Sequence, residues 1–524
     1  MEQVQGIRGS SAGSDCAMMI TMDQSRAPYV ESIQRLAASN PLQVMVPGHG
    51  GTAEGGGAHL AEVFGEQIVN FDVPLMLDGI DLGENGSREQ SQQLAAEAWG
   101  ARRVWWLTNG ASQGNRTAAL AVRGLGERVL MQRSSHSSFT DGVLLGGLIP
   151  SFVAPNVDER HGIAHGLTPA RLDEAIKEEI EHGRKPASVY VVSPSYFGST
   201  ADVRGLADVA HSHGVALIVD GAWGAHFGFH PDLPESPARL GADIVISSTH
   251  KLAGSLTQAS MLHLGEGPFA DVLEPLIDRA YTMTASTSGS AILMGSLDLA
   301  RRALVQGTEK IGESLRCAER LRELVRADDR LSIISDHFDE YPDIVATDQL
   351  RVPIDVSQLG QSGHWVRNRL IVEHNVFFEM STATSIVAVI GALATPDVDR
   401  IMAALLAVAD DADALRRAGQ ADKATEFPPL PAAGTLRMLP RAAYFAESVL
   451  VTAHQAIGRV SADTLAAYPP GIPNLVPGEE ITEETVTFLQ AVAASPTGVV
   501  RGAADPLVAT FRVVRDPVTA ASMS

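Results

Sequence analysis

Cysteine is almost absent from this sequence. Only Cys16 and Cys317 occur among its 524 residues, and they lie far apart in the chain. Two such cysteines cannot form the disulfide framework of a small secreted protein or a cysteine-based zinc finger. This usage suits a reducing compartment, so we expect a cytoplasmic location.

Long apolar runs and an excess of positive charge are also lacking. The longest apolar stretches, such as residues 142–149 and 385–394, are far shorter than the roughly 20 residues that span a bilayer. The 40 Lys and Arg residues against 62 Asp and Glu give a formal charge of −22, which repels nucleic acid and anionic lipid. We therefore expect no membrane and no nucleic acid among the partners.

The N-terminal residues do not have the pattern of a secretory signal. Residues 1–26 contain no basic stretch followed by an apolar run. We predict a flexible arm over residues 1–27.

Apolar residues, at 45% of the chain, are sufficient for more than one core, and the length predicts two or three domains. From about residue 87, helical and strand patterns alternate, which is typical of an α/β domain with a largely parallel sheet. Predicted strands cover residues 103–108, 128–132, 188–192, 215–219 and 243–247.

Three polar residues mark predicted helix starts. Ser87 with Gln90 has the spacing of a capping box, Thr168 precedes a proline at the first helical position, and Asp202 precedes an apolar helical pattern. Beyond about residue 305 the chain becomes rich in helix. We predict a large domain over residues 28–310, C-terminal α+β structure over 311–524, and a linker or long surface loop over 418–434.

A polar loop follows the predicted strand at residues 103–108. Its residues Ala111, Ser112 and Gln113 open the next helix, where backbone N–H groups and a hydroxyl can hold a phosphate. A plain strand-to-helix turn with a cap is an equal alternative for this stretch alone.

Other polar residues follow neighbouring strands. His136 comes after residues 128–132, Asp220 ends a buried apolar run, and Ser248, His250 and Lys251 follow residues 243–247. In an open parallel sheet such residues collect at the carboxyl edge of the strands. A lone Asp or Lys is usually a surface charge, but together with a phosphate loop and a flat imidazole they indicate a pyridoxal phosphate site.

The chemistry of pyridoxal phosphate explains each residue type. A deprotonated lysine binds an aldehyde as a Schiff base. An aspartate keeps the pyridine nitrogen protonated, which makes the ring an electron acceptor. The imidazole of His136 can stack on one face of the ring, and the small Ala222 leaves space on the other.

Several stretches of the chain are similar to known enzymes. The similarity covers roughly residues 28–495, and its most specific parts are Ser248-Thr249-His250-Lys251 and Tyr468-Pro469-Pro470-Gly471-Ile472-Pro473; further parts are residues 28–29, 47–49, 193–196, 256–263, 286–288, 296–298 and 458–462. The chain resembles the major-domain family of bacterial ornithine/lysine/arginine decarboxylases in a short form without the N-terminal wing domain. These are fold type I enzymes related to aspartate aminotransferase.

The resemblance implies the roles of individual residues. Lys251 would bind the cofactor aldehyde, Asp220 the pyridine nitrogen, and His136 would stack on the ring, while His250 would be a second proton-handling group. The remaining cofactor contacts implied are Ala111, Ser112, Gln113, Ala222, Trp223, Ser248 and Thr287, the last reaching the neighbouring subunit's cofactor. A homodimer or a dimer of dimers is therefore expected, with residues 28–310 as the cofactor-binding domain.

Two departures from the family pattern lie near the expected substrate position. Ser137 and Ser138 follow His136 where the family usually has lysine, and Gly221-Ala222-Trp223 follows Asp220 where short members tend to have Glu-Ala-His. The resemblance implies decarboxylation of ornithine, lysine or arginine to its amine. Because the departures lie near the substrate, an oxidase or aminotransferase acting on a basic amino acid is the alternative, and a non-catalytic binding homologue is a more remote one.

Two other patterns are weaker. Residues 48–53 superficially match a glycine-rich dinucleotide loop, but no regular helix pattern follows them. His161 and His165 have helical spacing without an acidic ligand, so we interpret them as surface or core residues and expect no metal site.

Overall fold

The computed structural model describes residues 22–83, 85–419, 428, 430–468, 471–495 and 498–515. Cys16, most of the arm predicted at residues 1–27 and most of the predicted linker lie outside the described residues.

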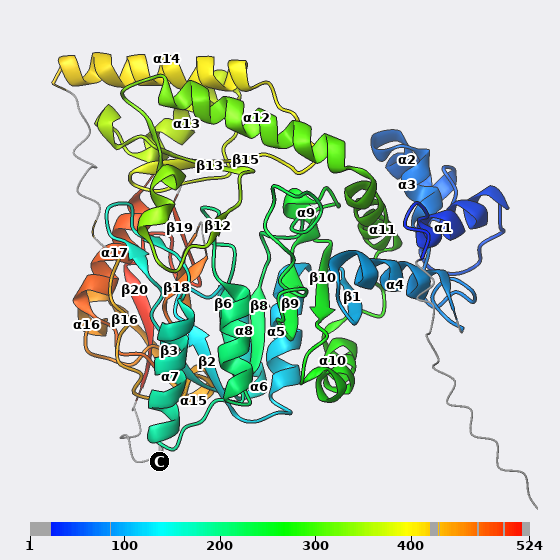
Figure 1. Cartoon of the computed structure of the whole chain (residues 1–524), viewed down its shortest axis with the longest axis horizontal. Coiled ribbons are helices and arrows are strands. Elements are labelled where there is room, and N and C mark those ends of the chain that lie inside the picture. Colours follow the sequence, from blue (N-terminus) through cyan, green and yellow to red (C-terminus); the bar gives the residue numbers. More distant parts are fainter. Residues whose placement is uncertain are drawn as a thin grey trace, which may run out of the picture.

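The centre of the molecule is a seven-stranded sheet, whose strands lie side by side across the lower half of Figure 1. Its strands, in spatial order, are β1 (Arg103–Leu107), β10 (Ser260–Leu264), β9 (Ile244–Ser247), β8 (Ala216–Asp220), β6 (Ser188–Val192), β2 (Arg128–Gln132) and β3 (Ile149–Val153). Every neighbouring pair is parallel except the two pairs that include β10. The predicted α/β class with a mainly parallel sheet is confirmed.

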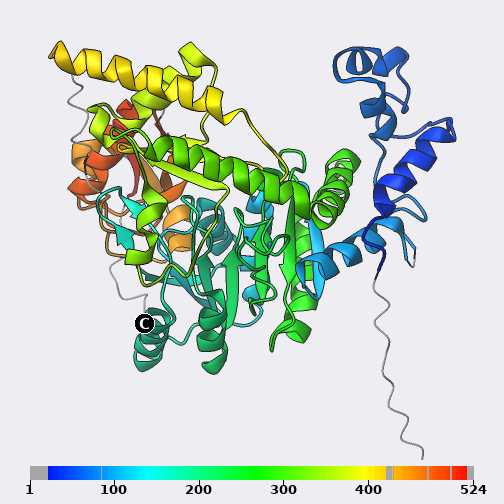
Figure 2. The same ribbon diagram turned by 45° about the horizontal axis from the view of Figure 1, so that its top comes forward.

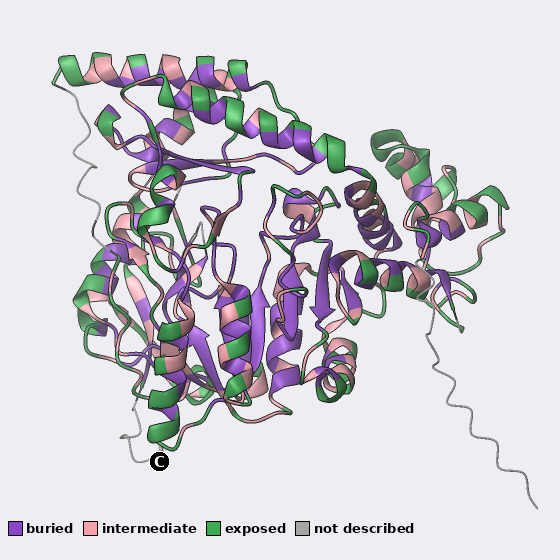
Figure 3. Cartoon of the chain, in the orientation of Figure 1, coloured by how far each residue is buried: buried purple, intermediate pink, exposed green. Residues whose placement is uncertain are grey.

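Helices cover both faces of this sheet, so its strands are buried on both sides (Figure 3). One face packs against α5 (Gly110–Val122), α6 (Ser137–Gly146) and α10 (Ala270–Thr284). The other face packs against α7 (Pro169–Glu181) and α8 (Val203–Ser212). Burial on both faces explains why these strands are continuous apolar runs in the sequence.

Two of the predicted helix starts are confirmed. The Thr168 hydroxyl accepts a hydrogen bond from Arg171 N at the start of α7. Asp202 accepts one from Gly205 N at the start of α8. Each side chain satisfies an N–H that the first helical turn leaves without a backbone partner.

The capping box predicted from Ser87 and Gln90 is wrong. Ser87 is the first residue of α4 (Ser87–Trp99), and Gly86 stands at the cap position without a side-chain bond. The Ser87 hydroxyl lies 2.5 Å from the Ser32 hydroxyl of α1 (Pro28–Ala38) and donates to Gly79 O. A buried contact between two helices has thus taken the hydroxyl that the local pattern assigned to a cap.

The N-terminal segment extends away from the sheet, as the blue helices of Figure 2 show. It contains α1, η1 (Gly55–Gly57), α2 (Ala58–Phe64) and α3 (Glu66–Phe71). Asp298 of α11 (Ala291–Gln306) anchors α1, because its carboxylate accepts hydrogen bonds from Tyr29 N and the Ser91 hydroxyl.

An antiparallel sheet of four strands follows, in the order β11 (Ser332–Ile333), β13 (Arg351–Asp355), β15 (Ser385–Val389) and β14 (Met380–Ser381). Helices α12 (Thr308–Arg326), α13 (Gly363–His374) and α14 (Val398–Arg417) pack with it in one continuous apolar core. The short elements of this part and of the connections before it are β4 (Val157–Asp158), β5 (Ile163–Ala164), β7 (Ser199–Thr200), α9 (Thr249–Leu252), η2 (Ile334–Glu340), β12 (Ala346–Thr347) and η3 (Ser357–Leu359).

The C-terminal part has its own apolar core. It consists of α15 (Pro440–Phe445), β16 (Ser448–Thr452), α16 (Ala453–Ala456), β17 (Leu465–Tyr468), β18 (Ile472–Leu475), α17 (Glu483–Ala494), β19 (Val499–Arg501) and β20 (Thr510–Val514). Mixed helix and strand after residue 311 agree in character with the α+β prediction, whereas the domain boundaries at 27 and 310 stay a prediction. Within the described parts of the chain, no helix combines the length and apolarity needed to cross a membrane.

Candidate active site

The predicted site residues lie at the carboxyl edge of the parallel strands. Asp220 is the last residue of β8, the turn to His136 follows β2, and α9, which contains Lys251, follows β9. The loop after β1 reaches the same edge, since Gly110 N donates to Gln258 O just before the antiparallel strand β10 begins. The structure therefore brings these separate loops together, as the sheet topology requires.

Asp220 is held by a buried network of hydrogen bonds. Its Oδ2 accepts hydrogen bonds from Asn115 Nδ2 at 3.0 Å and from the Tyr190 hydroxyl at 2.5 Å. Its Oδ1 accepts one from Ala222 N at 3.1 Å. Burial raises the pKa of Tyr190 well above its ordinary value, so the phenol keeps its proton and donates. These donors hold the carboxylate in one orientation.

The same network extends to His136, which caps α6. Its Nδ1 accepts a hydrogen bond from Ser138 N at 3.2 Å and lies 2.8 Å from the Ser138 hydroxyl. That hydroxyl also receives a hydrogen bond from Asn115 Nδ2 at 2.9 Å. Burial lowers the pKa of His136, which favours the neutral imidazole. Ser138, noted above as a departure from the family pattern, therefore links the imidazole to the Asp220 network.

Lys251 Nζ lies 3.6 Å from the centre of the Trp223 ring. The pKa of this amine is lowered to about 7, mainly by burial; the Asp220 charge opposes this shift and the Arg351 charge adds to it. A substantial fraction of the amine is then neutral near pH 7. Neutral lysine is the nucleophilic form that attacks an aldehyde.

Arg351 lies against the Trp223 ring, with its guanidinium carbon 3.9 Å from the ring centre. The side chain is fully buried and donates to Tyr196 O. Asp348, also fully buried, lies 3.6 Å from Arg351 Nε and 3.0 Å from His226 Nε2. Burial lowers the pKa of Arg351 to about 10. Trp223 is therefore in contact with a cationic side chain that also contacts Tyr196 O and the Asp348 carboxylate.

The other predicted residues have the following positions. The side-chain Oε1 of Gln113 accepts a hydrogen bond from Asn109 N and closes the loop before α5, where Ala111 and Ser112 occupy the first turn. Ser248 is buried, and His250 donates through Nδ1 to Ala259 O. Burial lowers the pKa of His250. Thr287 is exposed in the turn between α10 and α11, so its predicted role requires a second copy of the chain.

The residues present fit pyridoxal phosphate. Gly110 has a φ of +70°, and open space surrounds the position where a side chain would begin. Gly110 N donates to Gln258 O, but the next N–H groups of α5, those of Ala111 and Ser112, have no carbonyl partner within the helix and are available to a phosphate. A fixed carboxylate, a lysine with a lowered pKa and a neutral imidazole complete the donor set for this cofactor.

The family models of known proteins match most of this chain. The model for the Orn/Lys/Arg decarboxylase major domain matches residues 27–383, and the model for the C-terminal domain of the same family matches residues 432–497. The chain belongs to the Orn/Lys/Arg decarboxylase family. The resemblance stated from the sequence is confirmed, and with it a decarboxylase with pyridoxal phosphate as cofactor and a basic amino acid as the class of substrate.

Relatives with related names match this chain. Arginine decarboxylase of Bacillus subtilis (strain 168) is 32% identical over 504 residues, which cover 94% of this chain and 99% of the relative. Arginine decarboxylase of Bacillus anthracis is 30% identical over 506 residues, covering 95% and 99%. Lysine decarboxylase of Hafnia alvei is 26% identical over 327 residues, covering 58% and 43%.

Solved structures share the fold at lower identity. Lysine decarboxylase A from Pseudomonas aeruginosa has a TM-score of 0.78 at 20% identity, covering 93% of this chain and 80% of that one. Lysine decarboxylase LdcF from Francisella novicida has a TM-score of 0.77 at 19% identity, covering 93% and 81%. These likenesses confirm the predicted fold type I architecture.

Sequence reasoning missed four residues of the site. Asn115, Ser138, Tyr190 and Arg351 hold Asp220, His136 and Trp223 in place. A polar Asn115 on an otherwise apolar helix and a hydroxyl within the buried strand at residues 188–192 were signals of the first and third. Arg351 had no such signal, because it reaches the site from a distant sheet.

The histidines considered as alternative ligands have other partners. His161 lies 2.7 Å from Asp158 and 3.3 Å from Asp355, and His165 is buried against Phe338. Across the described ranges, no group of three or more His, Cys, Asp or Glu side chains is arranged to hold a metal ion.

Proposed function

We propose that this enzyme decarboxylates L-arginine to agmatine with pyridoxal phosphate. The observation that carries the choice of substrate is the pattern of relatives. Four arginine decarboxylases match at 30–32% identity over 87–95% of this chain. Two lysine decarboxylases match at 25–26% over 53–58% of this chain, and a biodegradative arginine decarboxylase of Escherichia coli matches at a similar level, 26% over 54%.

We also propose the roles of the site residues. Lys251 binds the cofactor aldehyde, and its lowered pKa supplies the neutral amine that this bond requires. Ala111, Ser112, Gln113 and Ser248 bind the phosphate at the start of α5. His136 would lie against one face of the cofactor ring. The small Ala222 would leave space on the opposite face, and Trp223 would be a further cofactor contact.

Asp220 holds a proton on the pyridine nitrogen. The bound cofactor supplies a conjugated ring that accepts the electron pair left when the carboxylate departs as carbon dioxide. Asn115 and Tyr190 keep the Asp220 carboxylate oriented toward its task, so little reorganisation is needed as charge develops.

A proton must return to the α-carbon after carbon dioxide leaves. Lys251 and His250 are the two candidates, since both lie on α9 at this edge of the sheet. Burial lowers the pKa of Lys251 to about 7, so its ammonium and amine forms coexist near neutral pH, and burial lowers the pKa of His250, which favours its neutral form there.

The active assembly is proposed to be a homodimer in the cytoplasm. Thr287 is exposed in one chain and would complete the site of a neighbouring subunit. Scarcity of cysteine supports the location.

The test is to incubate the purified holoenzyme with L-arginine, L-lysine and L-ornithine in turn. Carbon dioxide, amine, hydrogen peroxide and keto acid are measured together. We expect carbon dioxide and agmatine in equal amounts, with arginine the best substrate by kcat/KM. The Lys251→Ala variant should form neither.

Other outcomes would contradict the proposal. Keto acid without carbon dioxide would indicate the oxidase or aminotransferase alternative. A higher kcat/KM for lysine or ornithine would retain the decarboxylase and reject arginine as its substrate.

A further inference from the structure

We propose that the buried Arg133–Glu479 ion pair is a positioning device, through which the C-terminal part of the chain holds the His136 turn against the cofactor. This inference rests on the proposed function, because it assumes that His136 contacts the cofactor. Arg133 directly follows β2 and lies three residues before His136.

Arg133 is surrounded by acceptors from the C-terminal part. Its Nη2 lies 3.1 and 3.0 Å from the two carboxylate oxygens of Glu479, and its Nη1 donates to Pro473 O at 2.6 Å. Glu479 Oε2 also accepts from Val476 N at 2.9 Å. Only 15% of the Arg133 side chain and 1% of the Glu479 side chain are exposed. Glu479 thus contacts one guanidinium nitrogen and Pro473 O the other, and together these two contacts fix the direction of the guanidinium group.

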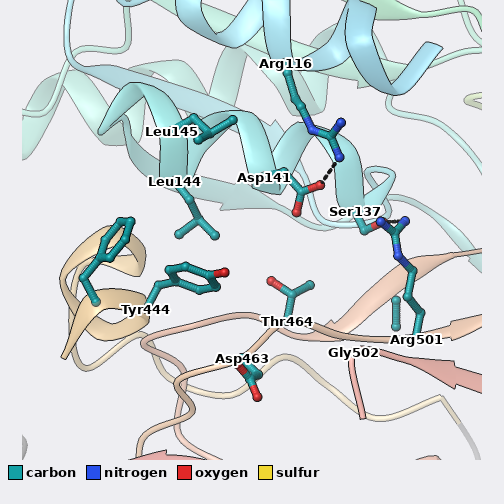
Figure 4. A pocket seen from close by; sticks show the side chains of 12 residues that line it. Arg116, Ser137, Asp141, Leu144, Leu145, Tyr444, Asp463, Thr464, Arg501 and Gly502 are labelled. Atoms are coloured by element: carbon teal, nitrogen blue, oxygen red, sulfur yellow. Dashed lines mark hydrogen bonds and ion pairs between the residues drawn. The ribbon is translucent and has the colours of Figure 1, made fainter. Parts of the chain in front are cut away.

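A second set of contacts holds the other side of the turn. Ser137 N donates to Gly471 O at 3.2 Å. Arg501 of β19 donates through Nη1 to the Ser137 hydroxyl at 3.1 Å, as the dashed line at the right of Figure 4 shows. The turn at residues 134–136 is therefore bracketed by Arg133 and Ser137, and both are bonded to residues more than 300 positions later in the chain.

Two sets of contacts fix different parts of the turn. Within the cofactor network, Ser138 and Asn115 fix the imidazole of His136 relative to Asp220. The Arg133 and Ser137 contacts instead fix the backbone of the turn relative to the C-terminal part. Movement of this backbone shifts the imidazole, and a small misplacement near a reacting centre is costly in rate.

A purely stabilising role can be distinguished from this positioning role. Replacing Glu479 leaves the buried Arg133 charge without its partner, which destabilises any protein. Replacing both members by apolar residues of similar volume removes that penalty. It does not restore the hydrogen bond from Arg133 to Pro473 O, so the turn is still less firmly held. Stability and cofactor binding should therefore separate in the double variant.

The experiment compares Glu479→Gln, the double variant Arg133→Met with Glu479→Leu, and Arg501→Ala with the wild-type enzyme. Glu179→Gln is the matched control, because Glu179 of α7 also accepts two hydrogen bonds from one arginine, Arg184, and contacts Ser151 of β3 and not the His136 turn. Pyridoxal phosphate is titrated into each apoprotein and followed by its visible absorbance. Unfolding temperature, kcat and KM for arginine are measured alongside.

We expect Glu479→Gln and the double variant to weaken pyridoxal phosphate binding about tenfold and to lower kcat about 10- to 100-fold, as expected for a shifted site group. The double variant should recover the unfolding temperature without recovering affinity. Arg501→Ala should show a smaller loss in the same direction, and Glu179→Gln should lower the unfolding temperature only.

Wild-type affinity for pyridoxal phosphate in the double variant and in Arg501→Ala would overturn the inference. Loss of affinity that follows unfolding temperature in every variant, including Glu179→Gln, would also overturn it. A wild-type enzyme that binds pyridoxal phosphate without forming agmatine would contradict the proposed function instead, and the titrations would still decide the role of this ion pair.

Discussion

The amine of Lys251 lies where a charged lysine is disfavoured. Burial lowers its pKa to about 7 from 10.5. The Trp223 ring that the amine contacts carries no full negative charge, so it does not offset this cost of burying the ammonium form. The same burial that makes the amine reactive must therefore reduce the stability of the apoprotein.

This cost predicts a pH-dependent effect of Lys251→Met. Between pH 10.5 and about 7 the unfolded chain takes up a proton at Lys251 and the folded chain does not, so the cost grows as pH falls and is complete below about pH 7. Met removes it, and we expect the Lys251→Met apoprotein to gain about 4 kcal/mol at pH 7 and progressively less toward pH 10. Urea unfolding of both apoproteins across this range measures the difference. A gain that does not change with pH would contradict the explanation.

The Asp220 network predicts graded losses of activity. Tyr190→Phe removes one hydrogen bond to a charged acceptor and should lower kcat about tenfold with little change in KM. Asp220→Asn should lower kcat about 100- to 1,000-fold, because it removes the charge that the reaction needs.

Steady-state kinetics measures these two losses. Tyr281→Phe is the control, since the Tyr281 hydroxyl donates to Trp106 O and has no bond to Asp220. Equal losses in Tyr190→Phe and Tyr281→Phe would show that the Asp220 bond has no special role.

For individual residues, the sequence predicted those that carry charge but not those that orient them. Asp220 and Lys251 each follow an apolar strand, and a polar residue at that point has a structural meaning in any parallel sheet. Arg351 is on β13 of another sheet, and its contact with Trp223 depends on how two parts of the chain pack. No local pattern encodes that packing.

The helices and strands of the large sheet were predictable because local signals agree with tertiary structure. The strand predicted at residues 188–192 is β6, and the strand predicted at 128–132 is β2. Ser87 is the exception, since its hydroxyl bonds to another helix and not to its own first turn. Sequence spacing identifies a possible cap but not a competing partner.

The Thr168 cap predicts a local effect on α7. Thr168→Ala should reduce the free energy that keeps the first turn closed by about 1 kcal/mol, so amide exchange at residues 171–172 should be about fivefold faster. Hydrogen exchange followed by mass spectrometry measures this, with Thr168→Ser as the control that retains the hydroxyl. Unchanged exchange in Thr168→Ala would show that the cap does not stabilise the helix.

Large apolar side chains are exposed along the protruding N-terminal segment of Figure 2. Among them, Leu42 and Val44 are more than 90% exposed, and Val46, Val63 and Phe64 are about 70% exposed. So many exposed apolar side chains in one segment indicate a surface that another protein covers. In the proposed homodimer, a second copy of this chain would cover this surface, and the proposed role of Thr287 also depends on that copy.

We expect Val44→Glu combined with Val63→Glu to convert the homodimer to a monomer and to weaken pyridoxal phosphate binding. Light scattering gives the mass, and a cofactor titration gives the affinity. Val372→Glu on α13 is the control, because its side chain is 72% exposed but lies outside the N-terminal segment. A monomeric wild-type enzyme that binds the cofactor would contradict this arrangement.

The edge strand β1 has a consequence for synthesis of the chain. Among the described residues, its one neighbour in the sheet is β10, where Leu107 pairs with Ser260. A ribosome adding about 5–20 residues per second needs on the order of 10 s to pass from one to the other. Until then β1 has no partner, and the loop at Gly110 lacks its bond to Gln258. Glu479, which pairs with Arg133, emerges later still. A nascent chain can therefore complete its cofactor site only when most of its length has left the ribosome.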